Sequence, residues 1–199
     1  MFEAIVLAAG LSSRMGAENK LLLPFRGKAI LQHTLDALLN AQIDRVIVVT
    51  GYEQEKIQSL LRDHSVTLIH NENYRKGQLT SIQKGLSQLS SICNAFLICL
   101  SDMPLLNAAD CNALIEGCQT TNISEPIVVP HNGERAGNPK LFDIHYKKEI
   151  LSLDASKHQG AKGILEKYSN KVLYHNTNNL GLFFDVDTPR AYLELLEYQ

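Results

Sequence analysis

The chain has little net charge and no long apolar run, and these two absences exclude several classes of protein. Its 19 Lys and Arg side chains nearly balance 21 Asp and Glu, which leaves a formal net charge of −2. Because proteins that hold nucleic acid or an anionic membrane by charge carry a basic surface, neither partner is expected. No apolar stretch approaches the ~20 residues that span a bilayer. The apolar run that opens the chain is too short for a signal peptide and lacks its basic flank.

Cysteine and histidine do not form a recognisable pattern. The four cysteines show no Cys-x2-Cys spacing and the seven histidines are scattered, which argues against a disulfide framework and a zinc site. A reducing cytoplasm is the expected compartment. The chain also lacks the Gly-x-Ser-x-Gly nucleophile turn and both standard phosphate loops, Gly-x4-Gly-Lys-Ser/Thr and Gly-x-Gly-x-x-Gly. Any phosphate site must therefore use a different loop.

Apolar, β-rich runs alternate with segments of helical periodicity along nearly the whole chain. With 199 residues, 45% of them apolar and 20% charged, one globular domain over 1–199 is expected. The alternation predicts an α/β fold of three layers, with a mostly parallel, mixed sheet covered by helices on both faces. The expected strands are Ala4–Ala8, Arg45–Thr50, Val66–His70, Ala95–Leu100, Ile127–Pro130 and Lys171–Tyr174. The expected helices are Ala29–Ala41, Gln54–Arg62, Leu79–Leu89, Ala108–Cys118, Ala161–Tyr168 and one from Pro189 to about Glu197 capped by Thr188, while Ile144–Lys157 reads as helical and then irregular.

The first expected strand ends at a loop suited to phosphate. Ala8, Ala9 and Gly10 are small, so backbone N–H groups can approach phosphate oxygens and form an anion-binding concavity. Arg14 and Lys20 follow and would neutralise phosphate charge. The alternative is an ordinary turn with two solvated cations, but the presence of both cations favours phosphate.

An aspartate follows the expected strand Ala95–Leu100. In parallel sheets, ligands bind beyond the carboxyl ends of the strands, which is also where the first loop lies. Asp102 is therefore placed to hold Mg²⁺, which favours one or two carboxylates together with substrate phosphates, and Mn²⁺ can take its place. Helix capping is the alternative use, although the next helical pattern begins later, near Asn107.

Two further carboxylates lie near the end of the chain. Asp185 and Asp187 alternate along an extended segment and so project to one face. One of them could join Asp102 on the metal. Alternatively, Asp185 is solvated and Asp187 supports the cap of the last helix. The sequence leaves both possibilities open.

Three loops between these acidic positions could select the ligand. Gly77, Thr80 and Ser81 open a helix, where free amides and hydroxyls meet the positive end of the helix dipole. Asn71 offers an amide that could read a base edge, and the loop at 131–139 could contact an acceptor. Turn formation and capping are equally ordinary uses of each. A phosphate loop and an acidic site without a nucleophile fit direct transfer between two bound substrates.

The order of these motifs resembles the molybdenum cofactor cytidylyltransferase family over nearly the whole chain. The Ala8-Ala9-Gly10 form is similar to the cytidylyl branch, whereas guanylyl enzymes more often carry Ala-Gly-Gly. Two positions depart from the family pattern: Asn138 stands where many relatives carry His, and Ser101 where they carry Gly. The matching stretches are LAAGLSSRMG with KLLLP, VVTGY, HNENY, GQLTS, SDMPLL, PHNGERAGNP and DVDTP.

The resemblance implies a dinucleotide-binding-like nucleotidyltransferase fold and Mg²⁺-dependent transfer of CMP from CTP to molybdenum-bound molybdopterin, with release of pyrophosphate. Arg14, Lys20 and Asp102 would be catalytic, and Asp102 and Asp187 would hold the metal. Together with the loops above, the candidate nucleotide ligands are Ala8, Ala9, Gly10, Arg14, Lys20, Asn71, Gly77, Thr80 and Ser81. A molybdenum enzyme or its chaperone would be a further partner. Two alternatives stay open: another phosphorylated acceptor such as a sugar 1-phosphate, or a non-catalytic carrier of the pterin.

Overall fold

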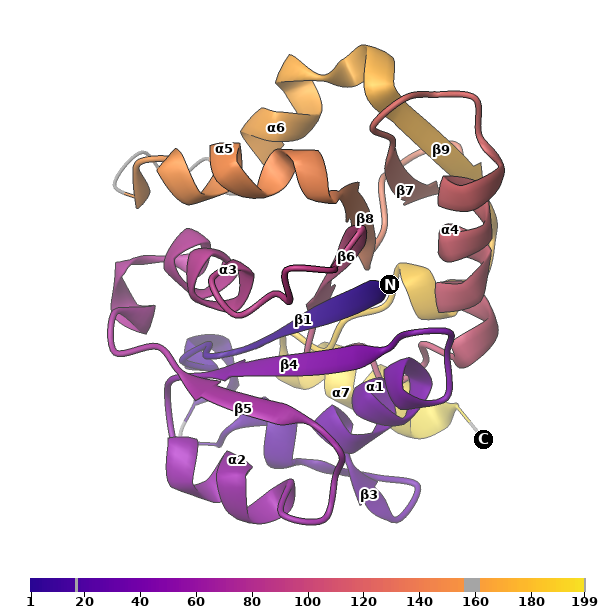
Figure 1. Ribbon diagram of the computed structural model, residues 1–199. Coiled ribbons are helices and arrows are strands. Elements are labelled where there is room, and N and C mark those ends of the chain that lie inside the picture. Colours follow the sequence, from indigo (N-terminus) through magenta and orange to yellow (C-terminus); the bar gives the residue numbers. More distant parts are fainter. Residues whose placement is uncertain (17, 156–161, 199) are drawn as a thin grey trace.

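A seven-stranded sheet runs through the middle of the molecule (Figure 1). The computed structural model describes residues 1–16, 18–155 and 162–198. The strand order is β5-β4-β1-β6-β8-β7-β9, and β8 runs antiparallel to β6 and β7 whereas the other neighbouring pairs are parallel. The predicted mostly parallel, mixed sheet is confirmed. The strands are β1 (Phe2–Ala8), β4 (Arg45–Thr50), β5 (Thr67–His70), β6 (Ala95–Leu100), β7 (Ile127–His131), β8 (Lys140–Asp143) and β9 (Val172–Asn176).

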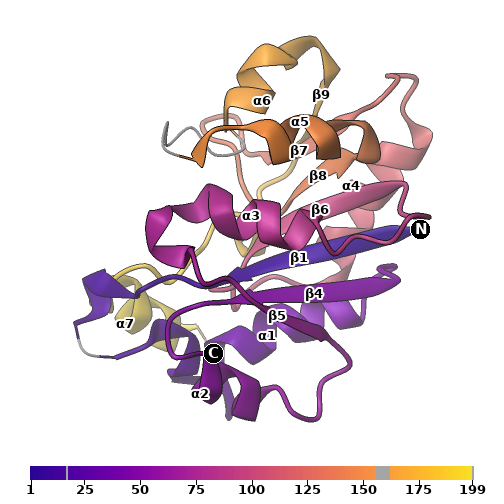
Figure 2. The same cartoon turned by 60° about the vertical axis from the view of Figure 1, so that its left-hand side comes forward.

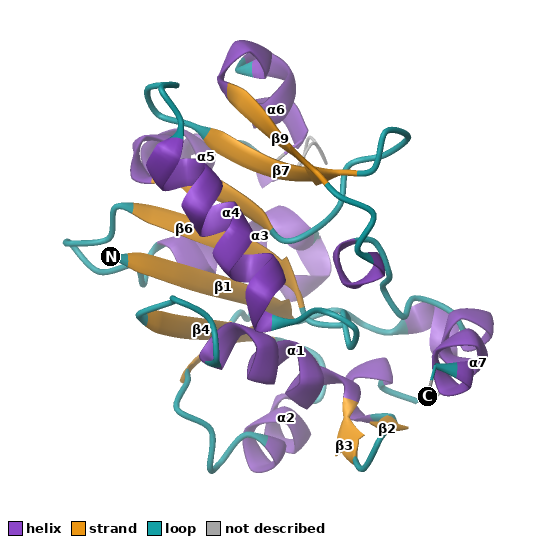
Figure 3. Cartoon of the chain, turned by 90° about the vertical axis from the view of Figure 1, so that its right-hand side faces the viewer, coloured by secondary structure: helices purple, strands orange, loops and turns teal. Residues whose placement is uncertain are grey.

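Helices cover both faces of this sheet, which makes the three predicted layers (Figures 2 and 3). One face packs against α1 (Ile30–Leu39), α2 (Gln54–Leu60) and α4 (Ala108–Thr120). The other packs against α3 (Gln78–Leu86), α5 (Lys147–Ser152) and α6 (Lys162–Lys167). No helix among the described residues is both long and apolar enough to cross a membrane.

The central strand shows why these runs form a buried parallel sheet. Along β1, Ala4 and Val6 face the layer of α1, while Ile5 and Leu7 face the layer of α3. Successive strand side chains point to opposite faces, so a strand that is covered on both sides must be apolar throughout. Burying each large aliphatic side chain stabilises the fold by about 1.5–3 kcal/mol.

The strand β8 was not predicted from the sequence. It has only four residues, and two of them, Lys140 and Asp143, are charged, so no apolar run marks it. Its Leu141 and Phe142 are fully buried on opposite faces, where pairing with β6 supplies the rest of the stabilisation. Ala161, where a helix was expected to begin, and the end of the segment Ile144–Lys157 lie outside the described residues.

The C-terminal helix α7 (Pro189–Glu197) begins as predicted. Thr188 is the N-cap, its Oγ1 accepts a hydrogen bond from the Ala191 N–H at 3.2 Å, and Pro189 occupies the first turn. The helix packs through Leu195 on a small cluster that includes Phe25 of the hairpin β2 (Pro24–Phe25) and β3 (Lys28–Ala29). This packing fixes the segment that precedes α7, which carries Asp185 and Asp187.

Candidate active site

Three segments that are far apart in the sequence meet at the carboxyl ends of β1 and β6. Arg14 and Lys20 come from the loop after β1, Asp102 follows β6, and Asp185 and Asp187 precede α7. Together with Gly10, Ser81 and neighbouring residues they line a cavity of about 280 Å³, which we call the polar cavity. The position agrees with the rule that ligands bind beyond the carboxyl ends of parallel strands.

The loop after β1 is held so that Lys20 points into this cavity. The Oγ of Ser12 accepts a hydrogen bond from the Lys20 backbone N–H at 3.3 Å, and the Oδ1 of Asn19 accepts one from the Leu21 N–H at 3.1 Å. Leu21 is buried in the core, and the short helical turn that it anchors directs the Lys20 side chain away from the core and into the polar cavity. A Cβ added at Gly10 would meet no atom within 4 Å, so this glycine borders open space at the cavity.

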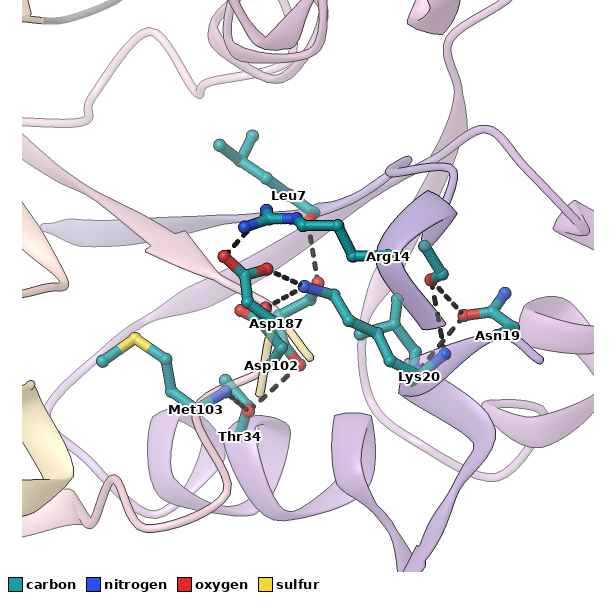
Figure 4. Close-up of polar contacts among 11 residues, drawn as sticks. Leu7, Arg14, Asn19, Lys20, Thr34, Asp102, Met103 and Asp187 are labelled. Atoms are coloured by element: carbon teal, nitrogen blue, oxygen red, sulfur yellow. Dashed lines mark hydrogen bonds and ion pairs between the residues drawn. The ribbon is translucent and has the colours of Figure 1, made fainter. Parts of the chain in front are cut away.

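Asp102 is fixed by its neighbours in the backbone. The Ser101 hydroxyl donates to the Leu7 carbonyl of β1 at 2.7 Å. The Thr34 hydroxyl of α1 donates to the Ser101 carbonyl at 3.2 Å and accepts from the Met103 N–H at 3.1 Å (Figure 4). Helix capping does not explain Asp102, since α4 is capped by Asn107. Asp102 is only 4% exposed and lines the polar cavity.

The segment Asp185-Val186-Asp187 is attached to Asp102 by its middle residue. The Val186 N–H donates to the Asp102 carbonyl at 3.0 Å, and the Val186 side chain is fully buried against Phe25 and the α7 cluster. Because side chains alternate along an extended segment, burial of Val186 turns both carboxylates toward the polar cavity. One oxygen each of Asp102, Asp185 and Asp187 lies within 4.8 Å of the other two.

Lys20 balances part of this negative charge. Its Nζ contacts the Asp102 carboxylate and lies 2.6 Å from Asp187 Oδ1, while Arg14 Nη2 lies 2.8 Å from Asp187 Oδ2 (Figure 4). Burial alone would lower the pKa of Lys20, but the Asp102 charge and hydrogen bond, with those of Asp187, raise it above its ordinary value. Burial would raise the pKa of Asp187, but the bond to Lys20 and the cations lower it.

The other two carboxyl groups respond in the opposite direction. Burial raises the pKa of Asp102 even though Lys20 opposes the shift. Burial, with the charges of Asp102 and Asp187, raises the pKa of Asp185 to about 6. Three carboxylates therefore face two cations. The raised pKa values of Asp102 and Asp185 show that their ionised forms are less favourable here than in water. Clustered carboxylate oxygens of this kind are the ligands that hard divalent cations such as Mg²⁺ prefer.

A second, larger cavity adjoins the first. It measures about 750 Å³, and the two share Leu7, Gln78 and Leu100 as lining residues. We call it the apolar cavity because aliphatic and aromatic side chains dominate its lining: Leu7, Leu79, Ile82, Ile98, Leu100, Phe142, Leu165 and Tyr174. Ala136 and Asn138, from the loop expected to contact an acceptor, also line it.

The structure does not bring every predicted site residue into the polar cavity. Asn71 is buried, and its amide donates to Thr80 Oγ1 and Ser81 Oγ at 2.9 Å each, so it supports the first turn of α3 rather than facing a base. Thr80 does not line either cavity, Gly77 lines the apolar one, and the Ala8 side chain faces the core. Of the predicted residues Asn71, Gly77, Thr80 and Ser81, Ser81 alone lines the polar cavity, whereas Ala9 and Gly10 of the first loop line it together with Arg14 and Lys20.

Two residues that shape the site carried no signal in the sequence. Thr34 lies within a helix, where a single hydroxyl is unremarkable, yet it holds both peptide groups that flank Asp102. Lys140 belongs to β8, the strand that was not predicted, and its side chain enters the apolar cavity. Only the pairing of β8 with β6 brings it there.

The comparison with protein families agrees with this geometry. The model of the MobA-like NTP transferase domain matches residues 4–172, which include Arg14, Lys20 and Asp102. The chain belongs to the MobA-like NTP transferase domain family. The resemblance to this group of nucleotidyltransferases is thereby confirmed.

Curated relatives of this MobA-like chain are distant and longer. The bifunctional protein GlmU of Geobacillus sp. is 28% identical over 188 residues, which cover 88% of this chain and 40% of the relative. The choline-phosphate cytidylyltransferase of Haemophilus influenzae is 43% identical over 77 residues, which cover 37% of this chain and 33% of the relative. The chain thus spans two fifths or less of the length of these two relatives.

Solved structures match the MobA-like chain over nearly its whole length. Rv0371c from Mycobacterium tuberculosis superposes with a TM-score of 0.81 at 25% identity and covers 98% of this chain and 97% of that one. A nucleotidyl transferase from Methanothermobacter superposes with a TM-score of 0.82 at 21% identity and covers 100% and 97%. These likenesses establish the fold.

Proposed function

We propose that this protein is a nucleotidyltransferase that transfers a nucleoside monophosphate from a nucleoside triphosphate to a phosphorylated acceptor and releases pyrophosphate. The observation that carries the proposal is the meeting of Arg14, Lys20 and the three carboxylates beside the open Gly10 loop. Membership in the MobA-like NTP transferase domain family supports it. A relative named choline-phosphate cytidylyltransferase supports both the donor class and a phosphorylated acceptor.

Within this class, we propose CTP as the donor and molybdenum-bound molybdopterin as the acceptor. The Ala8-Ala9-Gly10 form of the first loop and the cytidylyltransferase relative favour CTP. The order of motifs along the chain favours the pterin. The two adjoining cavities suit two substrates that react at their shared border, with the triphosphate in the polar cavity and the body of the acceptor in the apolar one.

The acidic cluster fits a divalent cation. Three carboxylates within 4.8 Å supply oxygen ligands, and burial raises the pKa of two of them despite Lys20, so a further positive charge would stabilise their ionised forms. Asp102 with Asp187 would hold Mg²⁺ or Mn²⁺, and Asp185 lies close enough to assist. When bound, the cation would neutralise charge on the triphosphate. A structure of Rv0371c was solved in complex with manganese.

The side chains of the polar cavity have separate tasks in the transfer. An oxygen of the acceptor phosphate attacks the α-phosphorus, the bond from the α-phosphorus to its bridging oxygen breaks, and pyrophosphate leaves with that oxygen. Lys20 exchanges its contacts with Asp102 and Asp187 for the departing oxygens, whose growing charge it stabilises. Arg14, which is largely exposed, holds the outer phosphates. No covalent intermediate is needed, so the protein acts by positioning and charge stabilisation.

A second candidate keeps the reaction and changes the acceptor to a smaller phosphorylated molecule, such as a sugar 1-phosphate or choline phosphate. The departure at Asn138, which lines the apolar cavity, favours it, because this position faces the acceptor rather than the nucleotide. A non-catalytic pterin carrier is the remaining alternative, and the acidic cluster with its two cations argues against it.

Pyrophosphate release tests the proposal directly. Each of the four nucleoside triphosphates is combined with molybdenum-loaded molybdopterin, glucose 1-phosphate or choline phosphate, in the presence of Mg²⁺ or Mn²⁺. We expect release with CTP and the pterin and none without the metal. Release with glucose 1-phosphate or choline phosphate, but not with the pterin, would select the second candidate. Pterin binding without any triphosphate consumption would support the carrier.

A further inference from the structure

Among the residues that the structure describes, the apolar cavity contains one cation that no carboxylate neutralises. Lys140 is the first residue of β8, and its Nζ donates to Asn138 Oδ1 at 2.7 Å. Within 1–16, 18–155 and 162–198, no acidic side chain forms an ion pair with it. Lys162 and Glu166 also line the cavity, but they pair with each other at 3.6 Å and are 82% and 67% exposed. The interior of the cavity thus carries a net positive charge at Lys140.

The surroundings of Lys140 make this charge unfavourable in the empty protein. The cavity that it enters is lined mainly by apolar side chains, among them Ile82, Leu165 and its strand partner Ile98. Burial lowers the pKa of Lys140 to about 8, so most of the side chain is still protonated at neutral pH. A partly buried cation that has only an amide oxygen for a partner lacks the compensation that buried charges ordinarily find. An anionic ligand would supply it.

The sheet register places this cation away from the reacting phosphate. Lys140 pairs with Ile98 of β6, four residues before Asp102. Because β6 ends at Leu100, the Lys140 backbone lies about two residues, or roughly 7 Å, before the end of the strand. Its side chain lines the apolar cavity and not the polar one. Asn138 and Lys140 flank Pro139, and both line the apolar cavity. A group bound at Lys140 therefore belongs to the end of an acceptor opposite to the phosphate that enters the polar cavity.

We propose that Lys140, oriented by Asn138, determines acceptor specificity by binding a second anionic group at the end of the acceptor distant from its reacting phosphate. The acceptor class is a phosphomonoester that carries a carboxylate or a further phosphate at the end distant from its reacting phosphate, as some sugar 1-phosphates of the second candidate do. This inference rests on the proposed function, because it takes the apolar cavity as the acceptor site.

Three sugar phosphates that differ only at carbon 6 test the proposal. Glucose 1-phosphate carries a hydroxymethyl group there, glucuronic acid 1-phosphate a carboxylate, and glucose 1,6-bisphosphate a phosphate. We expect the wild-type protein to favour at least one anionic probe over glucose 1-phosphate by roughly 10- to 100-fold in kcat/KM, the range of a charged hydrogen bond. Comparison of the two anionic probes distinguishes carboxylate from phosphate. The Lys140→Met variant should bring the ratio close to one, and Lys140→Arg should restore part of it.

The matched control is Lys148→Met, which removes an exposed lysine of α5 and should keep the wild-type ratio. Calorimetric binding of the same probes without a triphosphate separates this inference from the proposed function. If no transfer occurs but the wild-type protein binds an anionic probe more tightly than Lys140→Met does, transfer to these acceptors fails and the anion site at Lys140 stands; pyrophosphate release with the pterin tests the proposed function separately. Equal binding of neutral and anionic probes by the wild-type protein, including no binding of any probe, would overturn the inference. Retention of the preference by Lys140→Met would overturn it as well.

Discussion

The two cavities are each lined by a partly buried lysine, and the partners and the pKa shifts of these two lysines are opposite. Lys20 in the polar cavity contacts Asp102 and Asp187, and their charges raise its pKa. Lys140 in the apolar cavity has an amide oxygen as its partner, and burial lowers its pKa to about 8. The polar cavity already contains the counter-charges that its lysine needs. The apolar cavity leaves the counter-charge to its ligand.

This difference matches the ligands that the two cavities are proposed to bind. A triphosphate brings a high negative charge. In the empty protein Asp102 and Asp187 pair with Lys20 and Arg14; when the ligand binds, its phosphates can take over these two cations while its metal ion binds the carboxylates. An acceptor bound by Lys140 brings one anionic group to a site that is otherwise mostly apolar. The paired Lys20 stabilises the empty protein. Lys140, which has no carboxylate partner among the described residues, destabilises the empty protein but can select an acceptor that carries an anionic group. Four substitutions test this contrast, and they follow from the largest expected effect to the smallest.

Removal of the buried carboxylate of the polar cavity should nearly abolish activity. Asp102→Asn keeps the shape of the side chain but removes its charge, and we expect pyrophosphate release to fall by about 10²- to 10³-fold. The fold should persist, because burial already favours the neutral form of this carboxyl group. Steady-state kinetics and thermal denaturation measure both effects. Asp63→Asn, at an exposed position, is the control. Unchanged turnover in Asp102→Asn would remove this residue from the mechanism.

Replacement of the lysine of the polar cavity should affect turnover more than binding. For Lys20→Met we expect kcat to fall by about 10²-fold, because stabilisation of the leaving pyrophosphate is lost, while the KM for the triphosphate changes less. Lys28→Met is the matched control, since Lys28 is exposed and pairs only with Asp36 among the residues described. A larger effect on KM than on kcat would assign Lys20 to ground-state binding.

Replacement of the lysine of the apolar cavity should stabilise the protein. Lys140→Met removes a poorly compensated buried charge, and we expect the free energy of unfolding at pH 7 to rise by about 2 kcal/mol. Lys20→Met should have the opposite sign, because it leaves Asp102 and Asp187 without their nearest cation. Urea denaturation of both variants at pH 7 compares them. Destabilisation by Lys140→Met would show that the charge is compensated in the empty protein.

The same variant predicts a pH dependence. The folded protein releases the Lys140 proton near pH 8, whereas the unfolded chain keeps it to about 10.5. Between these values the unfolded state binds more protons, so this group makes stability rise with pH. The advantage of Lys140→Met over the wild-type protein should therefore shrink from pH 8 to pH 10. Urea denaturation across this range measures the difference, and a constant difference would contradict the lowered pKa.

The smallest effect is expected at the exposed edge of the polar cavity. The Arg14 side chain is 65% exposed, and its ion pair with Asp187 is screened by water. For Arg14→Ala we expect the affinity for the triphosphate to fall by about fivefold, with an unchanged thermal midpoint. Calorimetric titration measures the affinity, and Arg62→Ala, another exposed position, is the control. A loss comparable to that of Lys20→Met would place Arg14 at the reacting centre.

The sequence alone was sufficient for the local features. Apolar runs predicted the parallel strands because a strand that is buried on both faces has no room for polar side chains. Thr188 and Pro189 predicted the start of α7, since capping is decided within a few residues. The small residues before Gly10 and the cations after it marked the loop that lines the polar cavity, and Asp102 was placed by the strand that it follows. Each of these inferences needs only neighbours along the chain.

Tertiary structure decided which of these features face one another. Burial of Val186 turns Asp185 and Asp187 toward Asp102, and the side chain of Asn71 is used to hold α3 instead of facing the cavity. The strand β8 forms because β6 and β7 offer it partners, and its pairing carries Lys140 into an apolar environment. The charge that a side chain keeps, and what it can bind, depend on burial and on partners distant in sequence. Those are properties of the folded chain, which periodicity and spacing do not encode.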